Sequence, residues 1–337
     1  MNSNRKVVRN RPIPEQFANR VYLDPTYDPA FKAFFDSEDA LKDFLDGVLG
    51  LDGDNRIKTL RFTFDKTVLF HVPQRSKVVF DIFATTENGR FLNVEMQRLE
   101  NDFFTDRVLL YMAYLVIKAK KELELSKEFL ALTREQQEYR RYQLPETVSV
   151  WICDFDLPGS SGYRDEWVLY SESSLKSGNP VPVSKKNKYI FLSVPNFTKS
   201  ADEVRNPADV WLYLLNHARE GGNLPNFGSG IVEEALERIR VENADDDLLT
   251  AQELNMTTRE DYESWAAGLV IKARAKAVEE GRAEGHAEGR AEGRAEGLVE
   301  GGLNKARDMA RTLKAMGISI EKITAASGLS YTEVDAL

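Results

Sequence analysis

The sequence has few of the residues from which disulfide frameworks and zinc sites are built. It contains a single cysteine, Cys153, so no internal disulfide can form and a reducing compartment is its natural environment. Its three histidines, His71, His217 and His286, are far apart, and none lies at metal-ligand spacing with another. This pattern disfavours zinc.

Long apolar segments are also missing. The longest apolar run, about residues 108–117, is far shorter than the roughly 20 residues that span a bilayer. No apolar signal segment follows the basic start of the chain. We therefore expect a cytoplasmic protein that has no membrane partner.

An excess of positive charge is absent as well. The chain has 45 Lys and Arg residues against 54 Asp and Glu residues, which gives a net charge of −9. This balance argues against a surface that binds nucleic acid everywhere, so any DNA contact must be local. The 337 residues are enough for one large domain with a substantial core and appendages.

Two acids stand within apolar segments between residues 76 and 97, SKVVFDIFATTENGRFLNVEMQ. The segments are rich in strand-forming residues, and a turn that contains Asn88 and Gly89 separates them. Asp81 and Glu95 each lie between two apolar neighbours. Because an unpaired carboxylate costs several kcal/mol to bury, their placement suggests metal binding or catalysis.

The turn decides whether these two acids can meet. A two-residue loop would place Asp81 opposite Met96. A three-residue loop over residues 87–89, with Gly89 in the left-handed conformation that a bulge-type hairpin needs, places Asp81 opposite Glu95. We predict the second register.

Strict alternation along the two strands then assigns the side chains to two faces. The face of the acids also receives Lys77, Val79, Asn93 and Gln97. The other face, which includes Leu92, Val94 and Met96, turns into a core.

These residues resemble a known family. An Asp, a hairpin and then Glu-x-Lys is the signature of PD-(D/E)XK nucleases, and the variant that ends in Gln97 (NVEMQ) resembles the Rpn-type recombination-promoting nucleases, also known as a PD-(D/E)XK family transposase. Residues 28–32 (DPAFK) are similar to that family's opening D-x-x-F-K, and Arg107 and Tyr111 lie where its next helix carries Arg and Tyr. The resemblance covers roughly residues 24–220 and includes the family's habit of ending in Glu-Gly repeats.

The resemblance implies an α/β fold, in which helices flank a mixed central sheet and an α-helical extension follows. The order of elements expected from the sequence fits this core. It comprises helices over residues 28–51, a strand over 57–64, the hairpin, a helix over 103–125 that Asp102 caps, a strand over 147–155, further strands over 167–170 and 189–194, and a helix over 209–219.

The resemblance also implies a metal-dependent DNA endonuclease linked to recombination or mobile-element biology. Asp81 and Glu95 would bind Mg²⁺ or Mn²⁺, because hard carboxylate oxygens suit these ions. Gln97 lacks the charge of the usual motif lysine, so it can orient water but cannot lower the pKa of that water. Lys77 or Lys32 would supply the missing charge.

Several roles stay open between two interpretations. Asp28 is either an accessory acid of the metal site or a helix cap paired with Lys32 one turn later. Arg107, which lies one helical turn before Tyr111, either stabilises a scissile phosphate or forms a structural salt bridge. Asp154 is expected to be a solvated acid at a strand end. For the whole chain, the rival to an enzyme is a weakened nuclease fold that acts as a DNA-associated or scaffold protein.

The composition divides the chain into five segments. We predict a basic N-terminal arm (1–23), a nuclease-like domain (24–225), a helical extension that includes a helix opened by a capping box at Thr257 (226–279), a Glu-Gly repeat spacer (280–303) and a small helical module (304–337). Glycine recurs every fourth residue from Gly281 to Gly301, which makes a poor isolated helix. The repeat is either a spacer, a weak self-association segment or disordered, and we expect a homodimer or higher oligomer.

Overall fold

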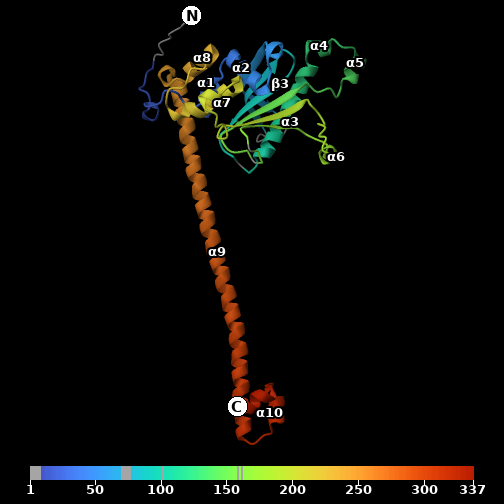
Figure 1. The fold of residues 1–337 in the computed structure, drawn as a ribbon, viewed down its shortest axis with the longest axis vertical. Helices are drawn as coiled ribbons and strands as arrows, with labels where there is room; N and C mark the ends of the chain where they lie inside the picture. Colours follow the sequence, from blue (N-terminus) through green and yellow to red (C-terminus); the bar gives the residue numbers. More distant parts are fainter. Residues whose placement is uncertain (1–8, 70–76, 101, 158, 161) are drawn as a thin grey trace. The chain divides into compact units, whose positions relative to one another are not determined.

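A six-stranded mixed sheet forms the centre of the fold (Figure 1). The computed structural model describes residues 9–69, 77–100, 102–157, 159–160 and 162–337. The strands are β1 (Leu60–Leu69), β2 (Lys77–Thr86), β3 (Phe91–Gln97), β4 (Thr147–Cys153), β5 (Arg164–Trp167) and β6 (Asn187–Ser193), in the order β1-β2-β3-β4-β6-β5. β4 pairs in parallel with β3 on one side and with β6 on the other. The pairs β1–β2, β2–β3 and β5–β6 are antiparallel.

One face of the sheet carries the larger core. It is covered by α1 (Asp28–Phe34), α2 (Glu38–Leu49), α7 (Pro207–His217) and α8 (Gly230–Ile239) (Figure 1). The aromatic rings of Phe34 and Phe35 lie 5.2 and 5.3 Å from that of Trp211, and all three side chains are buried. β4 is buried along its whole length, as its near-continuous apolar sequence predicts for a central parallel strand.

The opposite face packs against α3 (Phe104–Glu124). Here Phe104 and Tyr111 contact Trp151 of β4, with ring centroids 5.6 and 5.3 Å apart. The cap predicted at Asp102 is wrong, since α3 begins one residue later than expected, after Phe103, and has no side-chain cap. This layer also positions the polar residues of α3 described below.

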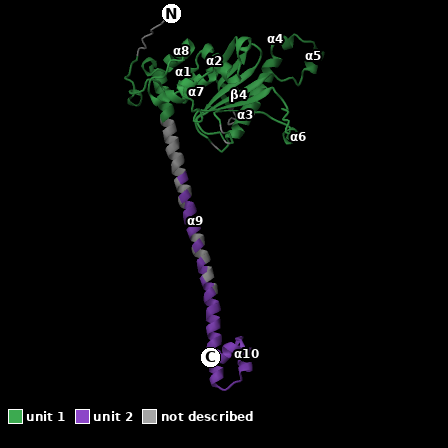
Figure 2. Cartoon of the chain, viewed as in Figure 1, with its two compact units in different colours: residues 1–259 green, residues 260–337 purple. Residues whose placement is uncertain are grey.

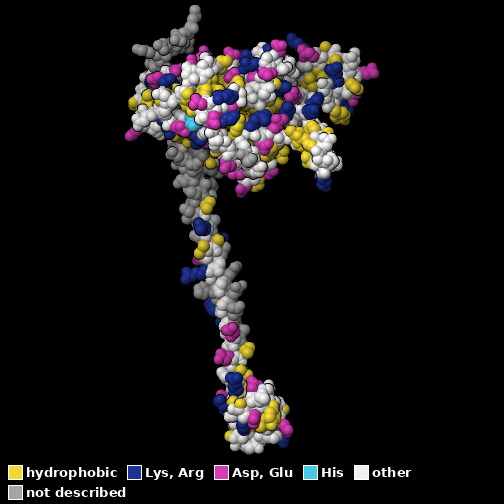
Figure 3. All heavy atoms as spheres, in the orientation of Figure 1, with side chains coloured by type: hydrophobic (Ala, Val, Ile, Leu, Met, Phe, Trp, Pro, Cys, Tyr) yellow, Lys and Arg dark blue, Asp and Glu magenta, His cyan; other side chains and the backbone are white. Residues whose placement is uncertain are grey.

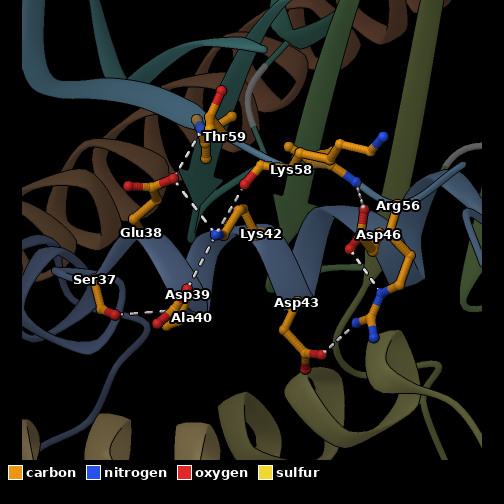
Figure 4. Close-up of polar contacts among 12 residues, drawn as sticks. Ser37, Glu38, Asp39, Ala40, Lys42, Asp43, Asp46, Arg56, Lys58 and Thr59 are labelled. Carbon is orange, nitrogen blue, oxygen red and sulfur yellow. Dashed lines mark hydrogen bonds and ion pairs between the residues drawn. The ribbon is translucent and has the colours of Figure 1, made fainter. Parts of the chain in front are cut away.

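Polar contacts tie α2 to the segment that leads into β1 (Figure 4). Asp46, buried on α2, accepts hydrogen bonds from the Ile57 backbone at 2.8 Å and from Arg56 at 3.0 Å. Arg56 also reaches Asp43 at 3.0 Å. The buried carboxylate is therefore paired, and it anchors the segment before β1 to α2.

The β2–β3 hairpin has the predicted register. Ile82 pairs with Val94 and Thr85 with Phe91, so continuation of the same register places Asp81 opposite Glu95. Gly89 has a φ of +71°, and its N–H donates to Thr86 at 3.0 Å, which closes a three-residue loop. The turn chemistry therefore set the strand alignment.

The prediction of strict alternation is wrong for the start of β2. Val78 and Phe80 pack on the α3 side of the sheet, whereas Ile82 packs on the opposite side. The change of face occurs at Asp81, next to Asp65 of β1, which has a φ of +52°. A left-handed residue within a strand locally alters its twist and redirects the neighbouring side chains.

The remaining elements are short or lie in the C-terminal part. They are α4 (Lys127–Leu130), α5 (Arg134–Tyr139), α6 (Glu172–Lys176), the 3₁₀ turns Glu15–Phe17, Gly53–Asn55, Ala201–Glu203, Ala218–Glu220 and Val241–Asn243, and then α9 (Asp246–Ala315), α10 (Ile320–Ser327) and α11 (Tyr331–Ala336). Near the N-terminus, Arg9 donates to the carbonyls of Val241 and Glu242, and Arg11 pairs with Glu253 at 3.1 Å.

The chain divides into two compact units, residues 1–259 and 260–337, and the boundary falls within α9 (Figure 2). The helix start predicted at Thr257 is wrong, because the backbone there is already helical. The repeat from Gly281 to Gly301 is helical too. In the second unit, Ala310, Ile323, Leu329 and Val334 form a small core. No helix in the described part of the chain is both long and apolar enough to cross a membrane.

Candidate active site

The two strand acids meet where β2 and β3 separate. The Asp81 N–H donates to Glu95 Oε1 at 3.3 Å, and the Met96 N–H donates to Asp81 Oδ2 at 2.9 Å. Each carboxylate thus accepts a hydrogen bond from the backbone of the other strand, in place of the ladder that ends at Ile82 and Val94. These reciprocal bonds hold both acids at one opening in the sheet.

Burial raises the pKa of both acids. Glu95 is 1% exposed, and burial, followed by the nearby charge of Asp81, raises its pKa well above the ordinary value. Asp81 is half-buried; burial raises its pKa to about 6, against the Met96 N–H, which lowers it. Two carboxylates in a poorly solvated site resist being charged together, and a cation between them would relieve this.

The site has an unused oxygen that fits a divalent cation. Asn93 donates to Glu95 Oε1 at 3.2 Å, whereas the buried Glu95 Oε2 has no hydrogen-bond partner. Carboxylate oxygens of this kind are the preferred ligands of Mg²⁺ and Mn²⁺. No group of three or more His, Cys, Asp and Glu suited to a metal occurs among the described residues, so other ligands must come from the main chain, water or substrate.

A lysine held between two acids lies on the α1 side of the site. Lys32 Nζ lies 2.8 Å from Asp28 Oδ2 and 2.6 Å from Asp65 Oδ1. Burial lowers the pKa of Lys32, but its bonds to Asp28 and Asp65 outweigh this and leave the pKa raised, so Lys32 is cationic. Asp28 raises and Lys32 lowers the pKa of Asp81, so the charges of both act on this acid.

Asp28 combines parts of both interpretations left open by the sequence. It is the first residue of α1 and pairs with Lys32, but its side chain makes no capping bond, because the cap position belongs to Tyr27. The cap interpretation is therefore wrong, and the expected pairing with Lys32 is present. A role as an accessory acid stays a prediction.

Asp65 is a member of this cluster that sequence reasoning missed. It lies in β1 between the residues that pair with Ile82 and Phe80, and hence across from Asp81. Asp is one of the few residue types that adopts a positive φ at modest cost, so an Asp within a strand-forming run was the available signal.

Arg107 of α3 approaches the acids from the other layer. Its Nη1 donates to Gln97 Oε1 at 2.9 Å and its Nη2 to Tyr111 Oη at 3.1 Å. Both partners are neutral, so the charge of Arg107 is not cancelled by them, and it lowers the pKa of Asp81 and of Glu95. Gln97 Nε2 in turn donates to the Leu99 carbonyl at 2.7 Å.

Lys77, the remaining predicted site residue, lies at the start of β2. Its backbone begins β2 and pairs with Leu69, but its side chain lies outside the described residues. The other predicted residues, Asp28, Lys32, Asp81, Glu95, Gln97, Arg107 and Tyr111, come from α1, β2, β3 and α3 and gather around the opening in the sheet.

A buried ion-pair cluster lies at the ends of β3 and β4. Asp154 was expected to be solvated, but its side chain is only 10% exposed and accepts bonds from Arg219 at 2.7 and 3.0 Å. Arg98, next to Gln97, lies 3.9 Å from Asp154 and stacks over the Tyr27 ring at 3.5 Å. The solvated interpretation is wrong because Arg219, 65 residues away in the sequence, closes over this strand end.

The visible face of the first unit is not a continuous basic surface (Figure 3). Positive and negative side chains are mixed over the visible face of the first unit (Figure 3). A polar pocket is lined by Thr86, Glu87, Asn88 and Arg90, at the opposite end of the hairpin from the acids. Among the described residues, Lys32 and Arg107 are cations whose charge acts on Asp81, so they are candidates to hold a polyanion there.

The sheet order, the helices on both faces and the helical C-terminal region define an α/β fold of the PD-(D/E)XK type. A family model described as PD-(D/E)XK nuclease family transposase matches residues 25–268, and the chain belongs to this family. Membership supports a nuclease or mobile-element role with DNA as the substrate. Neither curated proteins nor solved structures gave a match.

Proposed function

We propose that this protein is a divalent-metal-dependent endonuclease that hydrolyses phosphodiester bonds in DNA, in recombination or mobile-element biology. The observation that carries the proposal is the acid pair of Asp81 and Glu95, joined by reciprocal backbone hydrogen bonds, with Glu95 Oε2 buried and without a partner. A structural acid pair would be expected to use all of its buried oxygens.

In this proposal Asp81 and Glu95 hold the ion, and Asp28 adjusts the charge of the site. Bound Mg²⁺ or Mn²⁺ supplies a Lewis acid for attack on the phosphate. Arg107 offers a guanidinium to a phosphate oxygen, with Tyr111 and Gln97 fixing its direction. In place of the motif lysine, Lys32 supplies the positive charge. Lys77 stays a second candidate for this role.

Ion binding can be measured without catalysis. Millimolar Mg²⁺ should raise the melting temperature of the wild type, because a ligand that binds only the folded state stabilises it. Asp81→Asn and Glu95→Gln should lose this shift. Glu172→Gln, an exposed acid on α6, is the matched control and should keep it. An equal shift in all four proteins would show that the ion binds elsewhere.

Cleavage is tested with supercoiled plasmid in Mg²⁺, in Mn²⁺ and in EDTA. Wild type and Glu172→Gln should nick the plasmid only with metal, and Asp81→Asn should not. Its DNA affinity should be equal or higher, because the change removes a negative charge near phosphate. If the wild type leaves plasmid uncut with both ions and binds DNA as Asp81→Asn does, a weakened nuclease fold kept as a scaffold replaces this proposal.

A further inference from the structure

Helix α3 has an apolar face on each side. Its inner side packs on the sheet through Phe104, Val108 and Leu115. On the outer side, Leu109, Leu110 and Ile117 are 53%, 51% and 49% exposed. Apolar side chains of this size are normally exposed singly, so three within about two turns indicate a contact surface.

The outer side forms a regular stripe. Asp106, Leu110, Ala113, Ile117 and Lys121 follow one another at spacings of three or four residues, and each is exposed. This spacing keeps them on one line along the helix, as in the seam of a coiled coil. The small residue, Ala113, stands at its centre, where a second helix can approach closely.

The charges of the stripe make it complementary to itself. Leu110 and Ile117 lie on either side of Ala113, and Asp106 and Lys121 lie one turn further out. In an antiparallel pair of α3 helices, Leu110 faces Ile117 of the second copy and Asp106 faces its Lys121. A parallel pair would instead place each charge against its own copy, which is repulsive.

We propose that the outer face of α3 binds the α3 helix of a second copy of this chain, antiparallel, in a two-fold symmetric dimer. Such an interface uses the same patch on both subunits. Neither Asp106 nor Lys121 is used in an ion pair within the described part of the chain. The inner side of the same helix carries Arg107 and Tyr111, so the dimer joins two candidate sites through one pair of helices.

The proposal is tested by the mass of the full-length protein, measured by sedimentation over a range of concentrations. Wild type should be a dimer, and Leu110→Glu combined with Ile117→Glu should be a monomer with an unchanged circular dichroism spectrum. Leu175→Glu is the matched control, since Leu175 is 54% exposed on α6, outside the stripe. It should remain a dimer.

A charge exchange tests the antiparallel arrangement itself. Asp106→Lys or Lys121→Asp alone should weaken the dimer by about tenfold, because two like-charged contacts replace two ion pairs. The two changes together should restore it. A wild type that is monomeric at all concentrations overturns the proposal, as does a dimer that survives both glutamates but is lost on deletion of residues 280–302, which assigns association to the tail.

Discussion

Asp81 is one of two acids in the site whose negative charge is costly in the folded state. Its pKa is raised from 3.8 to about 6. Between these values the folded state keeps a proton that the unfolded state has released, so stability falls as pH rises through this window. Above about pH 6 the full penalty applies.

Replacement of this acid should therefore stabilise the metal-free protein at neutral pH. Asp81→Asn keeps an oxygen that can accept the Met96 N–H bond and removes the charge. We expect its free energy of unfolding to exceed that of the wild type by up to about 3 kcal/mol at pH 8, and by little at pH 4. Urea denaturation in EDTA at both pH values measures this. An equal gain at both would assign the effect to packing.

Asp65 offers a separate test of backbone strain. Asp65→Gly and Asp65→Ala both remove the bond to Lys32, but glycine adopts the φ of +52° freely and alanine does not. The glycine variant should be the more stable of the two by roughly 1 kcal/mol in urea denaturation. If alanine proved equal, the left-handed conformation would not persist in solution.

Among the elements, α2 and α7 pack closely at Gly47. A Cβ added at Gly47 of α2 would lie 2.3 Å from the backbone nitrogen of Ala208 of α7. Gly47→Ala should therefore cost about 1–3 kcal/mol of stability, despite the better helix propensity of alanine.

Gly230, the first residue of α8, provides the control for this change, because a Cβ there meets nothing within 4 Å. Gly230→Ala should be neutral or stabilising by up to about 1 kcal/mol when both variants are compared with the wild type in thermal melts. Destabilisation of both variants to the same extent would remove the argument from close helix packing.

Sequence information predicted those elements whose cause is local. The register of the β2–β3 hairpin followed from Gly89, and the burial of β4 followed from its apolar run. The side of the sheet on which Val78 and Phe80 pack could not be predicted in this way, because it depends on the conformation of Asp65 in the neighbouring strand. Local patterns carry no record of such cross-strand effects.

The same difference between local and long-range causes explains which residues of the candidate site could be predicted. Asp81 and Glu95 stood out because acids within apolar strands need a reason. Asp65 was not singled out, and Asp154 was expected to be solvated, since their partners Lys32 and Arg219 lie 33 and 65 residues away in the sequence. The partner of a charge becomes visible only once the chain is folded.

On the scale of the whole molecule, α9 combines great length with weak intrinsic helicity. Gly285, Gly289, Gly293 and Gly297 each cost about 1 kcal/mol relative to alanine, and an added Cβ at any of them meets nothing within 4 Å. Replacement of all four by alanine should slow amide hydrogen exchange across residues 281–302 and leave unit 1 unchanged. Equal exchange in both proteins would show that the glycines do not limit this helix.

The left-handed conformation of Asp65 also has a consequence for the outer strand β1. β1 is an outer strand, ten residues long, and such a strand invites pairing with strands of other molecules. A residue with positive φ interrupts the regular row of backbone donors and acceptors near the middle of this strand. At the other end of the sheet, β5 has only four residues, three of them charged. Both outer strands thus have features that disfavour pairing with strands of other molecules. At β1 this feature is the conformation of Asp65, whose side chain also bonds to Lys32.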